Sequence, residues 1–319
     1  MISVRELRVD YDQFCAVRDI SFEVNEGEVY GLIGPNGAGK TSAMRAIVGL
    51  LTPTYGDIRI AGIDLRENPL AVGHVLGFMP DFPPVYEDLL VWEFLDLFAS
   101  SYSIPKPQRL PEIDRWLVEV GLAEKRNEFV GGLSRGMRQR LMLAKTLLPE
   151  PRVLLLDEPA SGLDPHGRAQ MKDIIRNFAD NGGAVLVSSH ILSEMDEFCT
   201  AVGIMERGEM VVDGGVDEIS SSPDGSTTTL EIEFLEADLS ELNDHTSLEV
   251  FEGILSRNAL AGKPTRKGRK HIVAFDGGNE EAAELLQQLV TQGVAVCAFS
   301  RKRESLEDVF LQVGAKELS

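Results

Sequence analysis

The chain has 319 residues and a formal net charge of -20, from 31 Lys and Arg against 51 Asp and Glu. Hydrophobic residues make up 43% and charged residues 26%, which is the composition of a folded globular protein. The acidic balance argues against a general nucleic-acid-binding protein, because contacts to phosphates need positive charge. Three cysteines without CxxC spacing disfavour a disulfide framework and a zinc site, and indicate a reducing compartment.

Neither the N-terminus nor any internal run predicts a targeting or membrane-spanning segment. Residues 1–12 lack the charged start and apolar core of a signal peptide. No apolar run approaches the roughly 20 residues that span a bilayer. The sequence therefore predicts a soluble, cytoplasmic protein of one large or two modest domains.

The N-terminal part of the chain alternates short apolar runs with helical patterns. Val29–Ile33 predicts a buried strand, and a glycine-rich turn then leads into a helix over Thr41–Leu50. Val153–Leu156 and Ala184–Ser188 are further apolar runs of strand length. Such continuous runs are typical of parallel strands covered on both faces, so the alternation predicts an α/β domain over residues 1–219.

Three further regions complete the predicted organisation. Residues 85–148 place apolar side chains at helical spacing, which predicts a helical insertion in the α/β core. Residues 220–228 are rich in Ser, Thr, Gly and Pro and predict a linker. Residues 229–319 predict a small α+β accessory domain, with strands over Thr229–Phe234, His271–Phe275 and Val294–Phe299 and helices over Ser247–Ser256 and Asn279–Gln292.

The strongest local pattern is GPNGAGKT over residues 34–41, which fits G-x-x-x-x-G-K-[ST] between a predicted strand and a predicted helix. The glycines let backbone N–H groups surround a phosphate, and the helix start directs its positive dipole end at the same anion. Lys40 would contact the β- and γ-phosphates, and the Thr41 hydroxyl would bind Mg²⁺. The alternative is a glycine-rich turn without a ligand. The predicted nucleotide-binding residues are Gly34, Pro35, Asn36, Gly37, Ala38, Gly39, Lys40, Thr41 and Ser42.

Two carboxylates follow the apolar run Val153–Leu156. They would lie at the carboxyl end of a strand, where ligands bind in α/β proteins. Asp157 would hold Mg²⁺ through water, and Glu158 would act as general base on the attacking water. By itself the segment also fits a buried strand that leads into an acidic turn, but a phosphate loop in the same chain favours the nucleotide interpretation.

With both motifs present, residues 1–218 resemble the ATP-binding subunits of ABC transporters. The resemblance implies the P-loop ABC ATPase fold, ATP and Mg²⁺ as cofactors, and ATP hydrolysis with Lys40, Glu158 and His190 as catalytic residues. It depends on six elements in the family's order: Tyr11 as the aromatic residue that stacks on adenine, Gly34–Thr41 as Walker A, Leu133–Arg140 as the LSGGQ-like signature, Leu154–Pro159 as Walker B, Ser161–Asp164 as the D-loop and His190 as the switch histidine.

The signature segment also has a physical interpretation. Ser134 and Gly136 open a predicted helix, which offers a hydroxyl, free N–H groups and a positive dipole end to an anion. By itself this pattern also fits an ordinary N-capped helix. The resemblance implies that Ser134 and Gly136 contact the γ-phosphate held by a second subunit, with Asp164 communicating between the two sites. One P-loop and one signature per chain then imply a homodimer or a pair with a related subunit.

The chain departs from the family pattern at three positions. Arg135 and Met137 stand in the signature where Gly and Gln are usual. Asp81 stands where the Q-loop normally has Gln. A carboxylate can bind Mg²⁺ or its water but cannot donate as an amide does. We hypothesise that Asp81 binds at the metal and relays γ-phosphate occupancy to a membrane partner; the alternative is a loop aspartate that caps the following turn.

Two segments resemble the ATPase subunits of type-2 ABC exporters: SLEDVFL over residues 305–311 and GFMPDFPPVY over residues 77–86. The resemblance implies an exporter subunit, peripheral on the inner face of the cell membrane, that energises a separately encoded integral-membrane permease. No nucleic-acid partner is expected. The alternatives are a soluble ABC ATPase acting on nucleic acid or ribosomes and a nucleotide-gated regulatory scaffold. The basic segment Lys263–Lys270 is predicted to be a solvated loop rather than a site for acidic lipid or nucleic acid.

Overall fold

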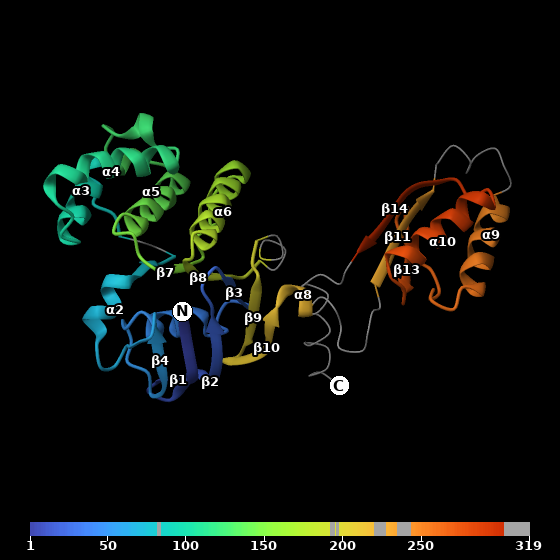
Figure 1. The fold of residues 1–319 in the computed structure, drawn as a ribbon, viewed down its shortest axis with the longest axis horizontal. Coiled ribbons are helices and arrows are strands. Elements are labelled where there is room, and N and C mark those ends of the chain that lie inside the picture. Colours follow the sequence, from blue (N-terminus) through green and yellow to red (C-terminus); the bar gives the residue numbers. More distant parts are fainter. Residues whose placement is uncertain (82–83, 192–194, 196–197, 220–227, 235–243, 303–319) are drawn as a thin grey trace. The chain divides into compact units, whose positions relative to one another are not determined.

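The computed structural model divides the chain into two compact units, Met1–Val216 and Asp217–Ser319 (Figure 1). The division lies at the start of helix α8 (Val216–Ile219), whereas the sequence predicts a boundary after residue 219. Most of the predicted linker and the whole of residues 305–311 lie outside the described residues. The structure describes residues 1–81, 84–191, 195, 198–219, 228–234 and 244–302.

A six-stranded sheet forms the centre of the first unit, in the order β10-β9-β3-β8-β7-β6. All neighbouring strands run parallel except β10, which pairs antiparallel with β9. Every residue of β3, β7 and β8 is buried, so the predicted parallel strands covered on both faces are confirmed. The strands span Val29–Ile33 (β3), Leu76–Met79 (β6), Val153–Asp157 (β7), Ala184–Ser189 (β8), Ala201–Glu206 (β9) and Glu209–Gly215 (β10).

A second, antiparallel sheet in the same unit has the order β2-β1-β4-β5. Helix α1 (Lys40–Ile47) packs with this sheet in one apolar cluster. The sequence predicts this helix to continue to Leu50. The helix ends earlier because Gly49 adopts a left-handed φ of 77°, a conformation in which glycine commonly terminates helices. The strands span Ile2–Tyr11 (β1), Phe14–Val24 (β2), Tyr55–Ile60 (β4) and Ile63–Asp64 (β5).

Helices dominate the stretch between β6 and β7, where apolar spacing predicts a helical insertion (Figure 1). Phe94, Leu117 and Leu143 are fully or almost fully buried and come from three different helices of this stretch. Besides α1, the described part of the first unit contains the helices α2 (Pro69–Val75), α3 (Val91–Ser101), α4 (Lys106–Glu119), α5 (Arg135–Leu147) and α6 (Pro165–Asp180), with 3-10 turns η1 (Ala123–Lys125) and η2 (Val130–Gly132). No helix in the described ranges is long and apolar enough to cross a membrane.

Beyond α8, the described residues of the second unit form a four-stranded antiparallel sheet with the order β12-β13-β11-β14 and two helices. Its chain order, β-α-β-β-α-β, is the split βαβ arrangement of ferredoxin-like folds, so the predicted α+β class is confirmed. Its core includes Leu230, Phe251 and Leu285. The elements are β11 (Thr228–Phe234), α9 (Asp244–Arg257), β12 (Thr265–Lys267), β13 (Lys270–Phe275), α10 (Asn279–Thr291) and β14 (Val296–Lys302).

The basic segment Lys263–Lys270 is largely exposed, as the sequence predicts, but it forms part of a hairpin and not a loop. It contains strand β12, which pairs with β13 and turns at Gly268, where φ is 67°. Lys270 Nζ lies 2.9 Å from the carboxylate of Glu231 and 3.8 Å from that of Glu233 on β11. Acidic side chains on the neighbouring strand therefore compensate part of the positive charge and allow a hairpin at the sheet edge.

Candidate nucleotide site

The site residues lie at the carboxyl ends of three adjacent strands. β8 lies between β3 and β7 in the sheet, and all three run parallel. The phosphate loop follows β3, Asp157 ends β7, and His190 follows β8. Since the carboxyl ends of parallel strands share one sheet edge, segments more than 100 residues apart in sequence meet there.

Two glycines let the phosphate loop pack against its neighbours. A Cβ atom at Gly34 would overlap the carbonyl oxygen of Met205 on β9. Gly39 has a φ of 104°, and a Cβ there would overlap the carbonyl oxygen of Ala16 on β2. Only glycine fits both positions, because the backbone approaches too closely for a side chain. The loop apex, Pro35–Gly37, is exposed, so its backbone faces outward.

Lys40 is buried against the loop that it follows, with 6% of its surface exposed. Its Nζ donates to the carbonyl oxygens of Gly34 at 2.6 Å and Pro35 at 3.2 Å, and lies 4.0 Å from Glu158 Oε1. Burial lowers the pKa of Lys40, and the nearby carboxylates of Glu158 and Asp157 oppose that shift. These contacts hold the amine between the loop and the carboxylates at the end of β7.

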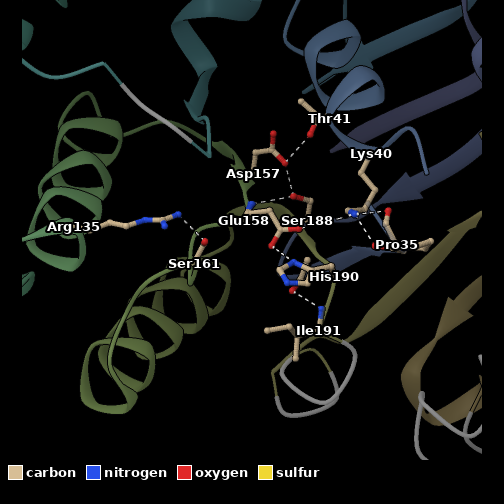
Figure 2. A network of polar contacts seen from close by, with 12 residues as sticks. Pro35, Lys40, Thr41, Arg135, Asp157, Glu158, Ser161, Ser188, His190 and Ile191 are labelled. Atoms are coloured by element: carbon tan, nitrogen blue, oxygen red, sulfur yellow. Dashed lines mark hydrogen bonds and ion pairs between the residues drawn. The ribbon is translucent and has the colours of Figure 1, made fainter. Parts of the chain in front are cut away.

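A serine contacts the Asp157 side chain and the Glu158 backbone at the end of β7 (Figure 2). Ser188 Oγ donates to Asp157 Oδ1 at 2.6 Å and accepts from the Glu158 backbone N–H at 3.0 Å. Thr41 Oγ1 lies 3.5 Å from the same Asp157 oxygen. Sequence reasoning missed Ser188 as a site residue, although a polar end to the apolar run Ala184–Ser189 directly before His190 was the available signal.

Glu158 and His190 form a close pair. The Glu158 carboxylate lies 2.9 Å from His190 Nδ1, and Figure 2 shows the two side chains directed at each other. Glu158 has a φ of 48°, an uncommon conformation for a residue other than glycine that is often found at functional sites. Burial raises the pKa of Glu158, while His190 and Lys40 act in the opposite direction. A carboxylate with a raised pKa beside an imidazole is suited to accept a proton from water.

The metal-binding capacity of the site depends on Asp157 and Thr41. Across the described residues, no group of three or more His, Cys, Asp or Glu side chains is arranged to hold a metal by itself. Mg²⁺ is typically bound by one or two carboxylates together with phosphate oxygens and waters. Asp157, whose Oδ1 lies beside the Thr41 hydroxyl, therefore fits a Mg²⁺ that arrives with a nucleotide.

Asp81 follows β6 at the edge of the same sheet. Its Oδ1 is buried and has no hydrogen-bond partner, while its backbone carbonyl accepts from Gln139 Nε2 at 3.2 Å. Burial, followed by the charge of Asp157, raises the pKa of Asp81. Asp81 and Asp157 thus lie within electrostatic range of each other, and the metal role of Asp81 stays a prediction.

The structure also places the residues predicted to contact adenine and a second subunit. Tyr11, at the end of β1, is 41% exposed, and its hydroxyl lies 3.4 Å from Ser42 Oγ on α1. Ser134 caps α5 by accepting from the Met137 backbone N–H at 3.3 Å. Asp164 caps α6 by accepting from the Gly167 N–H at 2.7 Å. Ser134 and Asp164 thus each stabilise the start of a helix in their own chain.

Comparisons with known proteins agree with this architecture. Residues 17–161 match the ABC transporter family. The uncharacterized ABC transporter ATP-binding protein YxlF of Bacillus subtilis is 34% identical over 313 residues, which cover 98% of this chain and 99% of that protein. The bacitracin transport ATP-binding protein BcrA of Enterococcus faecalis is 27% identical and covers 97% of this chain and 95% of its own length.

A solved ATP-binding subunit of an ABC transporter is 30% identical, covers 69% of this chain and 91% of its own, and superposes with a TM-score of 0.64. The near-complete overlap with YxlF extends the relationship beyond the first unit into the second. With the phosphate loop and the Asp157–Glu158 pair at the same edge of the sheet, these similarities show that the chain belongs to the family of ABC transporter ATP-binding proteins.

Proposed function

We propose that this chain hydrolyses ATP at the phosphate loop and uses the energy to drive a separately encoded integral-membrane permease, in the direction of export. The observation that carries the proposal is the convergence of Lys40, Asp157, Glu158 and His190 on adjacent strand ends. A buried ammonium, an ordered carboxylate and a carboxylate with a raised pKa are the groups that phosphoryl transfer to water requires.

Each side chain has a role that follows from its contacts. Lys40 neutralises charge on the β- and γ-phosphates, and Glu158 accepts the proton of the attacking water. His190 holds the Glu158 carboxylate and contacts the γ-phosphate. Ser188 orients Asp157, which with Thr41 would hold Mg²⁺. When bound, Mg²⁺ neutralises charge that develops on the phosphate oxygens.

A second copy of the chain, or a related subunit, would complete each site. Ser134 and Asp164 are exposed, and Ser134 begins helix α5. The backbone N–H groups at the start of that helix and its positive dipole end suit a γ-phosphate. Because the chain holds one phosphate loop and one signature segment, two complete sites require two chains.

The proposed transport role draws on the relatives. BcrA is named for bacitracin transport. The Escherichia coli protein YbhF, a probable multidrug ABC transporter ATP-binding protein, is 33% identical over 74% of this chain and 41% of its own length. One name refers to bacitracin transport and the other to a multidrug transporter, which supports export. A subunit that docks on a permease would lie at the inner face of the cell membrane.

Two measurements test the proposal. Purified full-length protein should hydrolyse ATP, and Lys40→Ala should lower turnover by about 10²-fold or more and weaken ATP binding. Lys106→Ala, which removes an exposed lysine at the start of α4, is the matched control and should behave as wild type. In detergent-solubilised membranes from the native organism, the tagged chain should retain a polytopic membrane protein. Equal turnover in wild type and Lys40→Ala would refute the ATPase, and recovery of the chain without any membrane protein would refute the permease.

A further inference from the structure

Arg135 connects the start of α5 to the loop between β7 and α6. It is the first residue of the helix after the cap Ser134. Its Nη2 donates to Ser161 Oγ at 2.9 Å, and Figure 2 shows the side chain extending from α5 to that hydroxyl. This contact joins the signature segment to the D-loop within one chain.

The packing around this hydrogen bond is close. Gly162 has a φ of 77°, and a Cβ atom there would lie 2.8 Å from both Cδ and Nε of Arg135. A Cβ atom at Gly136 would lie 3.2 Å from Leu163 Cδ2. The first turn of α5 therefore lies directly against residues 162–163, and the stem of Arg135 crosses a position where only glycine leaves room.

The same loop carries the proposed general base. The Ser161 backbone N–H donates to the Glu158 carbonyl oxygen at 3.1 Å, which closes the turn from Glu158 to Ser161. Glu158 itself holds the left-handed φ of 48°. Such a conformation persists only where the surroundings determine it, so the contacts of Ser161 help to fix the direction of the Glu158 side chain.

The position of Arg135 is electrostatically unusual. A cation at the start of a helix opposes the helix dipole, and the first turn of α5 contains no acidic residue. The Arg135 charge also acts on Asp81, whose pKa it lowers against the effect of burial. Arg135 thus interacts with the signature, D-loop and Q-loop segments. Its charge is unfavourable at the start of α5, and its interactions with Ser161 and Asp81 offset that cost.

We propose that Arg135 is a positioning residue that couples the signature helix to the turn carrying Glu158. The inference rests on the proposed function, in which α5 closes on a nucleotide held by a second chain. Movement of α5 at that contact is then transmitted through Arg135 and Ser161 to the chain's own Glu158. Occupancy of one site in the dimer thereby adjusts the base of the other, which is positive coupling between two sites.

The test compares Arg135→Ala, Ser161→Ala and the double variant in the full-length protein. We expect each single variant to lower kcat by about tenfold, with little change in the KM for ATP and with the Hill coefficient for ATP falling towards 1. The double variant should lose no more than Arg135→Ala, because Ser161→Ala removes the same hydrogen bond that Arg135→Ala already removes. Arg135→Lys keeps the charge but not the guanidinium fork, so it should restore kcat only in part.

Controls separate positioning from folding. Ser161→Ala removes one oxygen atom, so it tests the connection even if Arg135→Ala were to fold poorly. Binding of a fluorescent ATP analogue should match wild type in every folded variant, because the phosphate loop is untouched, and thermal melting identifies the variants that fold. Arg115→Ala, which removes an arginine paired with Glu112 on α4, is the matched control.

The possible outcomes keep the two proposals distinguishable. A wild-type protein without ATP turnover would overturn the proposed function and the coupling with it. A wild type that turns over ATP, together with unchanged kcat and Hill coefficient in Arg135→Ala and Ser161→Ala, would overturn the coupling alone. Additive losses in the double variant would also overturn it, because they would show that the two residues act separately.

Discussion

The two units of the chain bury different kinds of side chain. Among the described residues, the buried polar or charged side chains of Met1–Val216 are Lys40, Gln139, Thr146, Asp157, Ser188 and Ser189, whereas the second unit contains His271. Three of these six, Asp157, Ser188 and Ser189, lie at the carboxyl ends of strands in the parallel sheet, and Lys40 follows the phosphate loop at the same edge. Burial of charge is costly unless the groups are paired, so its concentration at one edge identifies a site maintained for chemistry.

The second unit shows the opposite pattern. Its buried apolar residues form one cluster, and the centre of the His271 ring lies 4.7 Å from that of Phe234 and 5.2 Å from that of Phe251. The first unit therefore retains buried charge at a site for chemistry, whereas the interior of the second unit serves packing. Variants of Glu158, Phe251, Asp164 and His271 test this difference.

The largest effect belongs to the proposed base. Glu158→Gln should lower ATP turnover by about 10²- to 10⁴-fold, because an amide cannot accept the proton of the attacking water. ATP binding should remain, and the protein should accumulate as a closed dimer on size-exclusion chromatography with ATP. Turnover within a few-fold of wild type would contradict the assignment of Glu158.

The second largest effect is on packing in the second unit. Phe251 is fully buried, and Phe251→Ala should lower the free energy of unfolding of that unit by about 3–5 kcal/mol without changing ATP turnover. The chain has two tryptophans, Trp92 and Trp116, and both lie in the first unit. Urea unfolding followed by tryptophan fluorescence should therefore stay unchanged while circular dichroism shows an earlier transition. An equal shift of both signals would show that the units do not unfold separately.

A smaller effect is expected at the start of α6. Asp164→Ala removes the cap of that helix and should destabilise the first unit by about 0.5–2 kcal/mol. Asp164→Asn retains a capping oxygen and should recover most of this loss. The measurement is the urea midpoint from tryptophan fluorescence. An unchanged midpoint in Asp164→Ala would contradict the capping role, and a loss of turnover in a stable Asp164→Asn would indicate that the carboxylate also acts between chains.

The smallest effect is a pH dependence of the second unit. Burial, followed by the charge of Arg266, lowers the pKa of His271 below its ordinary value of 6.5, and Glu252 opposes the shift. The unfolded chain then binds a proton more readily than the folded one, so stability falls as the pH drops below about 6.5. Melting followed by circular dichroism should show this fall in wild type, and His271→Leu should flatten it. The same slope in both proteins would exclude His271 as its cause.

Local patterns predict much of the fold and the centre of the site. The apolar runs before Gly34 and Asp157 predict parallel strands because burial on both faces leaves no polar alternation. In the second unit, the predicted helix over Ser247–Ser256 is contained in α9, which extends beyond it at both ends. The apolar spacing does not predict strand β12, because its three polar residues show no apolar periodicity. They form a strand only because they pair with β13 at the sheet edge.

The phosphate loop with Lys40 and Thr41, the Asp157–Glu158 pair and the family resemblance follow from the sequence alone, because each is a local pattern of residue types whose chemistry depends on spacing. Three contacts become visible only in the folded chain: Ser188 bonds both the Asp157 carboxylate and the Glu158 backbone N–H, Asp164 caps its own helix, and Arg135 reaches Ser161. The contacts of Ser188 and Arg135 join residues from different elements, and that of Asp164 stabilises the start of α6. The order of the strands and the packing of α5 against the D-loop bring them together, and no local pattern encodes that order.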